Sequence, residues 1–363
     1  MKCGIVGLPN VGKSTLFNCL SNAKAQSANY PFCTIEPNVG TVSVPDPRIY
    51  KLEELIKPER VVPAVVEIVD IAGLVKGASK GEGLGNQFLA NIRECNAIIH
   101  VLRCFDNDNI THVDGSIDPI RDKGTIDTEL QIKDLETVDK RIDKAKKMAK
   151  GGNREELKIA EVLESAKSFL EQGRNLREMD VDEIEAEILD SFHLLTFKPV
   201  LYLCNVDEAA VKSGNKYVDA VRAAVKDENA EVLVLAAQIE ADITELETYE
   251  ERQIFLEELG LEEPGVNRLI RSAYRLLKLQ TYFTAGVKEV RAWTIHEGST
   301  APQAAGVIHT DFEKGFIRAE VISYDNFVKY GSEAKARDAG KLSTEGKSYI
   351  VHDGDVMHFL FNV

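Results

Sequence analysis

A glycine-rich loop near the amino terminus has the residue types and spacing of a phosphate-binding site. Residues 7–14 read Gly-Leu-Pro-Asn-Val-Gly-Lys-Ser; a short apolar stretch precedes them, and residues 15–20 open a predicted helix. Between a strand and a helix, successive backbone N–H groups of such a loop hold phosphates at the positive end of the helix dipole. The loop therefore predicts binding of a nucleoside triphosphate.

The side chains of this loop have distinct expected roles. Lys13 should reach the β- and γ-phosphates and assist catalysis, and the hydroxyl of Ser14 should bind Mg²⁺. The other loop residues that we expect to contact the nucleotide are Asn10, Val11, Gly12 and Thr15.

Two downstream segments should respond to the γ-phosphate. An apolar run ends in Asp70 and is followed by Gly73. This pattern predicts a carboxylate that reaches Mg²⁺ through water and a backbone N–H beside the γ-phosphate. Thr34, between the loop and Asp70, is a candidate second Mg²⁺ ligand. Glycines at 77, 81, 83 and 85 make the following stretch typical of a switch that orders and disorders.

The residue that activates water is not obvious from the sequence. Leu74 follows Gly73, where many GTPases carry the glutamine that positions the nucleophile. An aliphatic side chain cannot orient water, so we expect slow intrinsic hydrolysis or a substitute group. His112, in a polar loop after a predicted strand, is the candidate because histidine exchanges protons near neutral pH. The alternative is an ordinary histidine of a surface loop.

The base-reading motif departs from the guanine-specific pattern Asn-Lys-x-Asp and reads Asn-Val-Asp-Glu at residues 205–208. The usual Asp accepts hydrogen bonds from guanine, and adenine offers neither donor. Glu208 is one methylene longer than that Asp, and Val206 removes the lysine stem that packs on the base, whereas Asn205 can still hold either purine. The change forfeits about 1–3 kcal/mol of guanine discrimination, so ATP is the predicted substrate. Ala236, after the last predicted strand of this domain, is a further expected contact.

Apolar runs indicate the elements that must position these groups. Three nearly continuous runs, residues 97–104, 198–204 and 231–235, predict buried strands of a mostly parallel sheet with helices on both faces. The loops at the carboxyl ends of such strands build the site. We therefore expect an α/β P-loop NTPase domain formed by residues 1–125 together with 196–278.

Residues 126–195 should form a helical insertion in that domain. Apolar residues recur every three or four positions on both sides of a Lys-Gly-Gly-Asn turn. They predict an antiparallel hairpin of helices at about 126–149 and 153–172, with a shorter helix near 181–195. The turn end is basic although the chain carries a net charge of −15. Candidate contacts there to RNA or the ribosome are Lys140, Arg141, Lys144, Lys146, Lys147 and Lys150. The alternative is the solvated face of a coiled coil.

The pattern changes again beyond residue 279. Three segments, residues 289–295, 316–322 and 349–361, predict strands, and Asp353-Gly354 marks a turn within the last of them. Short helices are predicted at 302–309 and 332–338. We expect a C-terminal α+β domain of the β-grasp type over residues 279–363.

Composition narrows the class of protein. The 363 residues are 44% hydrophobic and 28% charged, as in ordinary folded proteins. The apolar runs are too short to span a membrane, and the first leads directly into the phosphate loop instead of a cleavage site. Six cysteines without CxxC spacing favour reduced thiols over disulfides or zinc. We expect a cytoplasmic protein without a membrane partner.

Four segments together resemble one family: residues 7–14, 30–38, 70–77 and 205–208 are similar to the YchF/Ola subfamily of Obg-like P-loop NTPases. The resemblance extends over essentially the whole chain. It implies an ATP-hydrolysing switch that docks on the ribosome (70S or 50S) or RNA through the hairpin and the C-terminal domain, which resembles the TGS domain. Asn10 of the phosphate loop is a candidate for holding K⁺ beside the phosphates, as in some related NTPases. A GTPase of the same fold and a nucleotide-sensing protein with negligible hydrolysis are the alternatives.

Overall fold

The computed structural model describes residues 1–26, 39–71, 85–228 and 230–362. The described chain divides into two compact units. Most of the first comes from residues 1–23 and 67–269, and most of the second comes from residues 41–66 and from residue 270 onward.

A six-stranded sheet with the order β2-β4-β1-β5-β6-β7 is the centre of the nucleotide-binding fold. Its strands are β1 (Lys2–Val6), β2 (Val39–Ser43), β4 (Val65–Asp70), β5 (Ala97–Arg103), β6 (Val200–Asn205) and β7 (Glu231–Leu235). Neighbouring strands from β4 through β7 pair in parallel. Every residue of β5 and β6 is buried, because both faces of the sheet are covered. This confirms the predicted α/β architecture.

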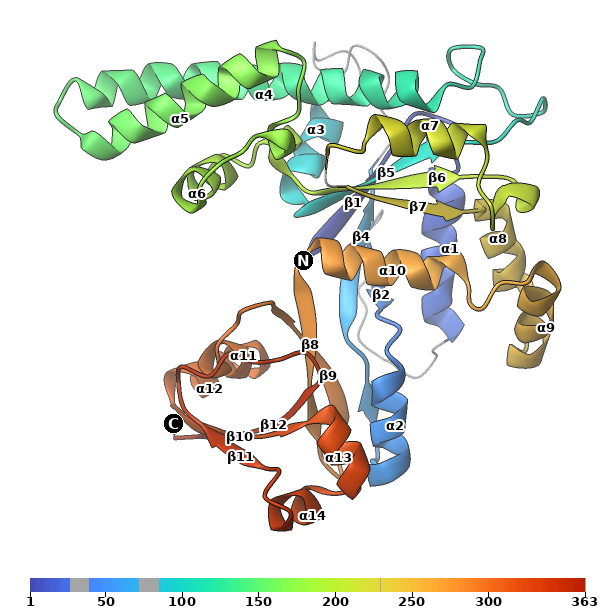
Figure 1. The fold of residues 1–363 in the computed structure, drawn as a ribbon, viewed down its shortest axis with the longest axis vertical. Coiled ribbons are helices and arrows are strands. Elements are labelled where there is room, and N and C mark those ends of the chain that lie inside the picture. The colour runs from blue at the N-terminus through green and yellow to red at the C-terminus, as the bar shows by residue number, and fades with distance from the viewer. Residues whose placement is uncertain (27–38, 72–84, 229, 363) are drawn as a thin grey trace. The chain divides into compact units, whose positions relative to one another are not determined.

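Helices flank this sheet (Figure 1). Figure 1 shows α1 (Lys13–Gln26) on one face and α7 (Lys216–Ala224) on the other. Further helices of this unit are α3 (Gly85–Glu94), α8 (Ala237–Glu245) and α9 (Tyr249–Leu259), and α10 (Gly265–Leu276) begins in it. Because the strands are parallel, their carboxyl ends, with the loops that follow, meet at one edge of the sheet.

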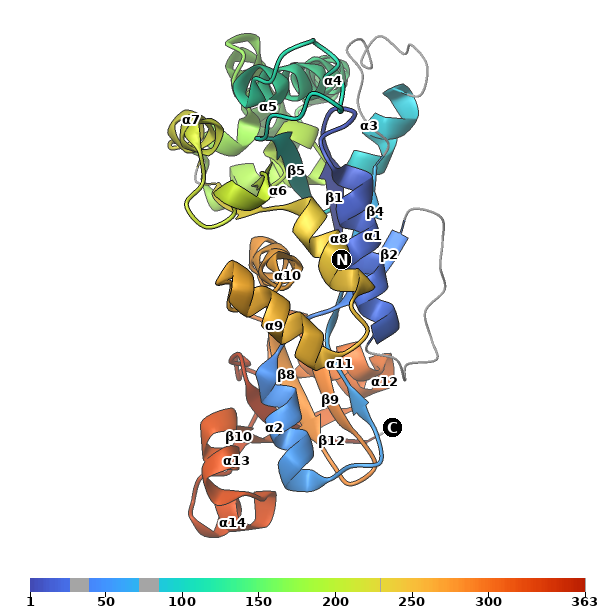
Figure 2. The ribbon, with the colours of Figure 1, turned by 90° about the vertical axis from the view of Figure 1, so that its right-hand side faces the viewer.

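The predicted helical hairpin is present and is longer than expected. Figures 1 and 2 show α4 (Pro119–Ala149) and α5 (Arg154–Glu171) side by side, and α6 (Glu183–Ser191) follows. α4 begins seven residues before the predicted position because Asp118 caps it and Pro119 occupies its first turn. Its 31 residues extend about 46 Å at 1.5 Å per residue. An apolar core that includes Val138, Leu163 and Leu170 holds the helices together.

The second unit contains a sheet with the order β11-β10-β12-β8-β9-β3. Its strands are β3 (Val61–Val62), β8 (Leu279–Ala285), β9 (Val290–His296), β10 (Phe316–Ser323), β11 (Ser343–Glu345) and β12 (Asp355–Phe361). β12 lies between β10, to which it is antiparallel, and β8, to which it is parallel. α11 (Ala301–Ile308) connects β9 to the following segment and packs on an apolar core with Tyr282 and Phe359. This order and the packed helix confirm the β-grasp type.

Several details of this unit differ from the predictions. The sequence pattern did not predict β8, because its first residues continue the apolar spacing of α10. The predicted strand 349–361 begins only at Asp355, after the turn that Gly354 makes with φ 88°. The predicted helices near 302 and 332 are α11 and α14 (Glu333–Asp338), and two further helices are α12 (Thr310–Lys314) and α13 (Tyr324–Tyr330).

The described chain forms two compact units, whereas the sequence predicts three domains. The hairpin falls within the first unit, and residues 41–66, with α2 (Pro47–Ile56), fall within the second. In the second unit β3 pairs with β9, and Arg48 bonds to Asp353. Pairings between residues so distant in sequence leave no local signal, and the three-domain division stays a prediction.

Candidate nucleotide-binding site

The phosphate loop lies between β1 and α1, as predicted. Asn10 and Gly12 both adopt positive φ angles, 63° and 101°. A Cβ atom on Gly12 would lie 2.3 Å from Nδ2 of Asn205. One on Gly7 would lie 2.6 Å from the carbonyl oxygen of Val101. Both positions therefore require glycine, because the loop packs directly on the two neighbouring strands.

Lys13 is held within this loop. Lys13 is 7% exposed, and its Nζ donates a hydrogen bond of 2.7 Å to the carbonyl oxygen of Leu8. Burial lowers the pKa of Lys13 to about 8, although the nearby Asp70 carboxylate opposes that shift. Ser14 and Thr15 lie exposed in the first turn of α1, where hydroxyl groups can reach a ligand bound by the loop.

Asp70 ends β4 and pairs in register with Ile5 of β1, next to the start of the loop. Its Oδ1 atom is buried and has no hydrogen-bond partner in the described structure. Burial raises the pKa of Asp70, and the charge of Lys13 partly offsets the effect. A buried acceptor without a partner fits a cation or its bound water. Thr34, Gly73 and Leu74 lie outside the described residues.

Asn205 connects the base-reading segment to the phosphate loop. It is 5% exposed; its Nδ2 donates to the Val11 carbonyl at 2.9 Å, and its Oδ1 accepts from the Ala237 N–H at 2.9 Å. The structure thus uses both ends of the amide to join β6, the loop and α8.

The rest of the motif separates into buried and exposed residues. Val206 is 3% exposed, and its N–H donates to the carbonyl oxygen of Leu235. Asp207 accepts from the N–H of Ala210 and caps a short 3₁₀ helix. Glu208 is exposed, and Ala236 is buried. Among these carboxylates, Asp207 has a structural bond, whereas Glu208 faces solvent.

An arginine that sequence reasoning missed organises the loop after β5. Arg103 is 1% exposed, and its guanidinium donates to the carbonyl oxygens of Phe105, Asn107 and Ile110. One signal was available in the sequence: a charged residue at the end of a predominantly apolar strand. The side chain shapes the loop by binding its backbone groups from inside.

His112 lies in that loop and is buried, so the surface-histidine alternative is wrong. Its Nε2 lies 2.8 Å from Oδ2 of Asp122, and its Nδ1 accepts from the Asp114 N–H at 3.1 Å. The adjacent residue, Thr111, accepts a hydrogen bond of 3.1 Å from the side chain of Asn10. The structure therefore brings the His112 loop into contact with the phosphate loop.

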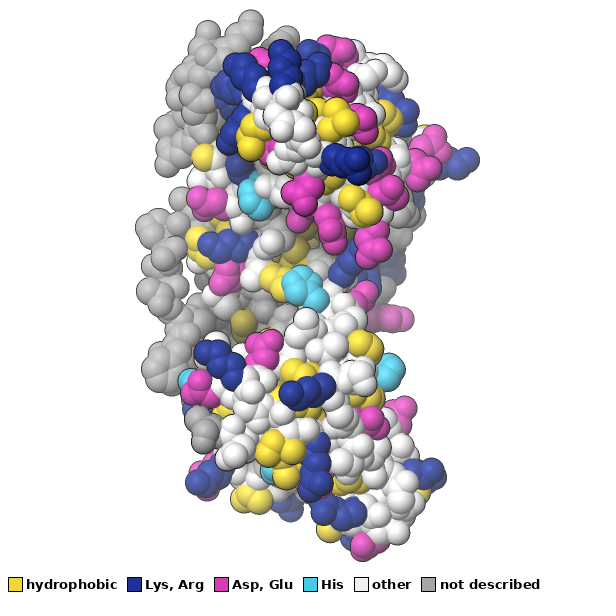
Figure 3. All heavy atoms as spheres, turned by 90° about the vertical axis from the view of Figure 1, so that its left-hand side faces the viewer, with side chains coloured by type: hydrophobic (Ala, Val, Ile, Leu, Met, Phe, Trp, Pro, Cys, Tyr) yellow, Lys and Arg dark blue, Asp and Glu magenta, His cyan; other side chains and the backbone are white. Residues whose placement is uncertain are grey.

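The basic end of the hairpin contains both paired and solvated side chains. Arg141 does not fit the predicted contact surface: it is paired with Glu156 at 2.9 Å, and its guanidinium lies over Phe192. Lys146 forms an ion pair with Glu164. The remaining predicted contacts are exposed and have no recorded ion pair with any described residue: Lys140, Lys144, Lys147 and Lys150. Figure 3 shows Lys and Arg side chains gathered on this end of the hairpin.

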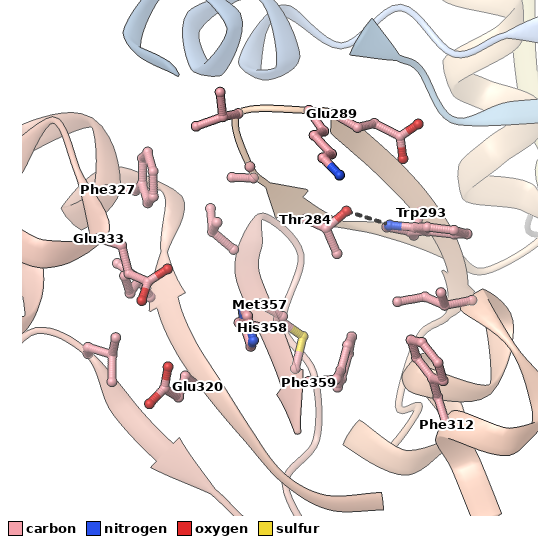
Figure 4. A pocket seen from close by; sticks show the side chains of 18 residues that line it. Thr284, Glu289, Trp293, Phe312, Glu320, Phe327, Glu333, Met357, His358 and Phe359 are labelled. Atoms are coloured by element: carbon pink, nitrogen blue, oxygen red, sulfur yellow. Dashed lines mark hydrogen bonds between the residues drawn. The ribbon is translucent and has the colours of Figure 1, made fainter. Parts of the chain in front are cut away.

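A separate cavity of about 530 Å³ lies in the second unit. Figure 4 shows aromatic side chains, among them Trp293, Phe312 and Phe327, around it, together with Glu320 and Glu333. Nε1 of Trp293 donates to the hydroxyl of Thr284 at 2.9 Å. This lining has neither a glycine loop nor the Lys-Ser pair, so the nucleotide site is assigned to the first unit.

Among the described helices, none is both long enough and apolar enough to cross a membrane. This agrees with the short apolar runs of the sequence.

Comparison with known proteins gives whole-chain matches. A family model described as "50S ribosome-binding GTPase" matches residues 2–144, and the model for the C-terminal part of YchF GTPases, described as a protein of unknown function, matches residues 279–362. The chain is 58% identical over 362 residues to "Ribosome-binding ATPase YchF" of Escherichia coli O157:H7, covering 100% of this chain and 99% of that protein. It is 54% identical over 365 residues to the protein of that name from Bacillus subtilis (strain 168), covering 100% of both.

Solved structures agree with these relatives. The Schizosaccharomyces pombe YchF GTPase matches with a TM-score of 0.90 at 40% identity, over 99% of this chain and 97% of that one. A GTP-binding protein from Pyrococcus horikoshii OT3 matches with a TM-score of 0.63 at 20% identity over 100% of both chains, which shows a shared fold. Identities of 54–58% along the whole length show that the chain belongs to the YchF family of P-loop NTPases.

Proposed function

We propose that the protein is an ATP-hydrolysing switch that binds the ribosome. One observation carries the proposal: Lys13, Asp70 and Asn205 meet at one edge of the sheet, around a loop whose backbone requires glycine. The two bacterial relatives described above are named ribosome-binding ATPases. A protein that binds ribosomes would act in the cytoplasm, which is the location that the sequence predicts.

The choice of base rests on the segment after β6. Glu208 is exposed, and the buried Val206 offers no stem to cover a base. Without the shorter carboxylate, discrimination in favour of guanine falls by about 1–3 kcal/mol. We therefore expect tighter binding of ATP than of GTP, although the Schizosaccharomyces pombe relative is named a GTPase.

Competition of ATP and GTP against one fluorescent analogue, with Mg²⁺, tests this assignment. A Glu208→Asp variant is the matched change, because it restores the length of the usual carboxylate without altering charge. We expect it to narrow the preference for ATP. Tighter binding of GTP than of ATP by the unaltered chain would refute the ATP assignment and favour a GTPase of the same fold.

Residues of the site also fit a divalent cation. The Ser14 hydroxyl and Oδ1 of Asp70, which has no hydrogen-bond partner among the described residues, would hold Mg²⁺, the carboxylate through water. Thr34 is the proposed additional ligand. Bound there, the cation would neutralise charge on the phosphate oxygens. Asn10 donates through its Nδ2, which leaves its Oδ1 available to K⁺. Hydrolysis measured with Na⁺ in place of K⁺, and in Asn10→Ala, tests the second cation.

Hydrolysis itself is assigned to Lys13 and His112. Lys13 would exchange the Leu8 carbonyl for phosphate oxygens, and His112 would orient or deprotonate the attacking water. Lys13→Ala should abolish hydrolysis, whereas His112→Ala should slow it and leave ATP affinity nearly intact. Binding of ATP without any Lys13-dependent hydrolysis would instead support a nucleotide sensor.

Contact with ribosomal RNA is assigned to the basic end of the hairpin. Four lysines there (140, 144, 147 and 150) are exposed, and Arg141 is excluded because Glu156 binds it. Each lysine that neutralises a phosphate should add about one unit to the salt dependence of binding. Co-sedimentation with ribosomes across salt concentrations should show weaker binding for Lys144→Glu and Lys147→Glu.

Lys226→Glu is the matched control for these variants. It makes the same charge change at an exposed lysine after α7, in the same unit but outside the hairpin. Equal losses of ribosome binding in Lys226→Glu and Lys147→Glu would show that only the net charge matters and that the hairpin end is merely solvated. The C-terminal domain is proposed as a second contact, to be tested by its deletion in the same assay.

A further inference from the structure

The loop that carries His112 is fastened to the first turns of α4. Oδ2 of Asp122 lies 2.8 Å from Nε2 of His112, and the two side chains are only 2% and 4% exposed. Oδ1 of the same carboxylate accepts from the guanidinium of Arg121 at 3.0 Å. That guanidinium also donates to the carbonyl oxygen of Ser116 at 2.6 Å. A buried acid, a histidine and an arginine thus close one network.

The partners of His112 determine which of its nitrogens carries the proton. The N–H of Asp114 can only donate, so Nδ1 accepts and bears no hydrogen. Nε2 therefore carries the hydrogen and donates a hydrogen bond to Oδ2 of Asp122. Both nitrogens are engaged, and protein covers the ring. A group that orients or deprotonates water needs a ring nitrogen within about 3 Å of that water, so His112 is held out of use in this arrangement.

The two partners differ in how firmly the fold holds them. Asp122 belongs to a helix that Asp118 caps, and its N–H donates to the carbonyl of Asp118. His112 belongs to a loop with a left-handed turn at Gly115. The carbonyl oxygen of Thr111, next to His112, accepts a hydrogen bond from the Asn10 side chain of the phosphate loop. A change in the phosphate loop can therefore pull on the histidine while the carboxylate stays in place.

We propose that Asp122 is a positioning residue that holds His112 in a sheltered, inactive place, and that hydrolysis requires release of His112 from this carboxylate. This inference rests on the proposed role of His112 in hydrolysis. It assigns to the start of α4 a restraint on the rate of turnover. The Asn10–Thr111 contact links that restraint to the phosphate loop.

Asp122→Asn tests the restraint with little change of shape. An amide can still accept from Nε2, but a neutral acceptor binds more weakly than a carboxylate. We expect the single-turnover rate of ATP hydrolysis to rise about fivefold, with ATP affinity unchanged. Asp118→Asn is the matched control, because it removes a charge four residues away and Asn still caps the helix. Its rate should stay within about twofold of the unaltered chain.

A double variant shows whether the effect passes through His112. In His112→Ala the rate should be low, and adding Asp122→Asn should no longer raise it. If His112→Ala slows hydrolysis but Asp122→Asn leaves the rate unchanged or lowers it, the restraint is refuted and the role of His112 stands. If His112→Ala leaves the rate unchanged, the proposed catalytic role fails first and the restraint with it.

A measurement on the unaltered chain keeps the inference testable if Asp122→Asn does not fold. Nitrogen-15 NMR of the His112 ring should report the Nε2–H form bonded to carboxylate with ADP bound. With ADP, Mg²⁺ and aluminium fluoride, which mimics the transferring phosphoryl group, that signature should disappear. Persistence of the same signature in the mimic would overturn the proposal.

Discussion

Asn205 offers the sharpest test of how the site is assembled, because one amide holds two elements on the sheet edge. Asn205→Ala removes the donor to Val11 and the acceptor for Ala237, whose bonds are both 2.9 Å long. A buried polar group left without a partner costs about 1–3 kcal/mol. Two such groups lead us to expect a loss of about 3 kcal/mol in the free energy of unfolding of the first unit, and much weaker ATP binding.

The assay must report on the first unit. The sole tryptophan of the chain is Trp293, which belongs to the second unit, so its fluorescence is a poor probe here. Urea unfolding followed by far-ultraviolet circular dichroism, and backbone hydrogen exchange at α8, would follow the relevant elements. ATP affinity is measured on the same samples.

Two further variants show whether the losses in Asn205→Ala come from the hydrogen bonds of its amide. Asn205→Asp keeps the acceptor for Ala237 but faces the Val11 carbonyl with a second acceptor, so it should weaken ATP binding as strongly as Asn205→Ala. Gln238→Ala, which removes an exposed hydrogen bond on α8, should cost less than about 0.5 kcal/mol. If Asn205→Ala and Gln238→Ala lose the same stability, the amide does not join the two elements and our account of the site is wrong.

Three other predictions concern charged groups. Arg141→Ala should lower the free energy of unfolding by about 2 kcal/mol, because it leaves Glu156 without its partner. Lys147→Ala should leave this free energy almost unchanged. Equal effects of the two variants in thermal unfolding would contradict the structural role of Arg141. Because burial raises the pKa of Asp70, its charged form destabilises the fold above the carboxyl's ordinary pKa. Asp70→Asn should therefore melt higher at neutral pH, lose that advantage in acid, and hydrolyse ATP poorly; a lower melting temperature at neutral pH would refute this. Burial lowers the pKa of Lys13 to about 8, so ATP affinity should fall as pH rises past that value in the unaltered chain and stay flat in Lys13→Arg. Parallel pH profiles would show that Lys13 is not the titrating group.

Sequence reasoning succeeded where structure depends on neighbours in the chain. The glycine loop, the buried parallel strands and the turn of the hairpin all follow from local composition and spacing, and the structure contains each of them. Asp70 and Asn205 could be placed at one edge because the carboxyl ends of parallel strands meet there. The start of α4 was missed because its first turns bury polar residues such as Asp122 and leave no apolar period to recognise.

Long-range contacts account for what the residue pattern left open. A basic run predicts an exposed surface, yet Arg141 meets Glu156 because the second helix folds back on the first. A histidine in a polar loop suggests solvent, yet His112 is buried because α4 brings Asp122 against it. β3 pairs with β9 across more than two hundred residues, a pairing that no local pattern predicts. Local propensity specifies the helices and strands of this chain. Side chains acquire their partners only when distant segments pack together. A polar group that gains such a partner stabilises the fold, whereas one that stays without a partner is available to a ligand.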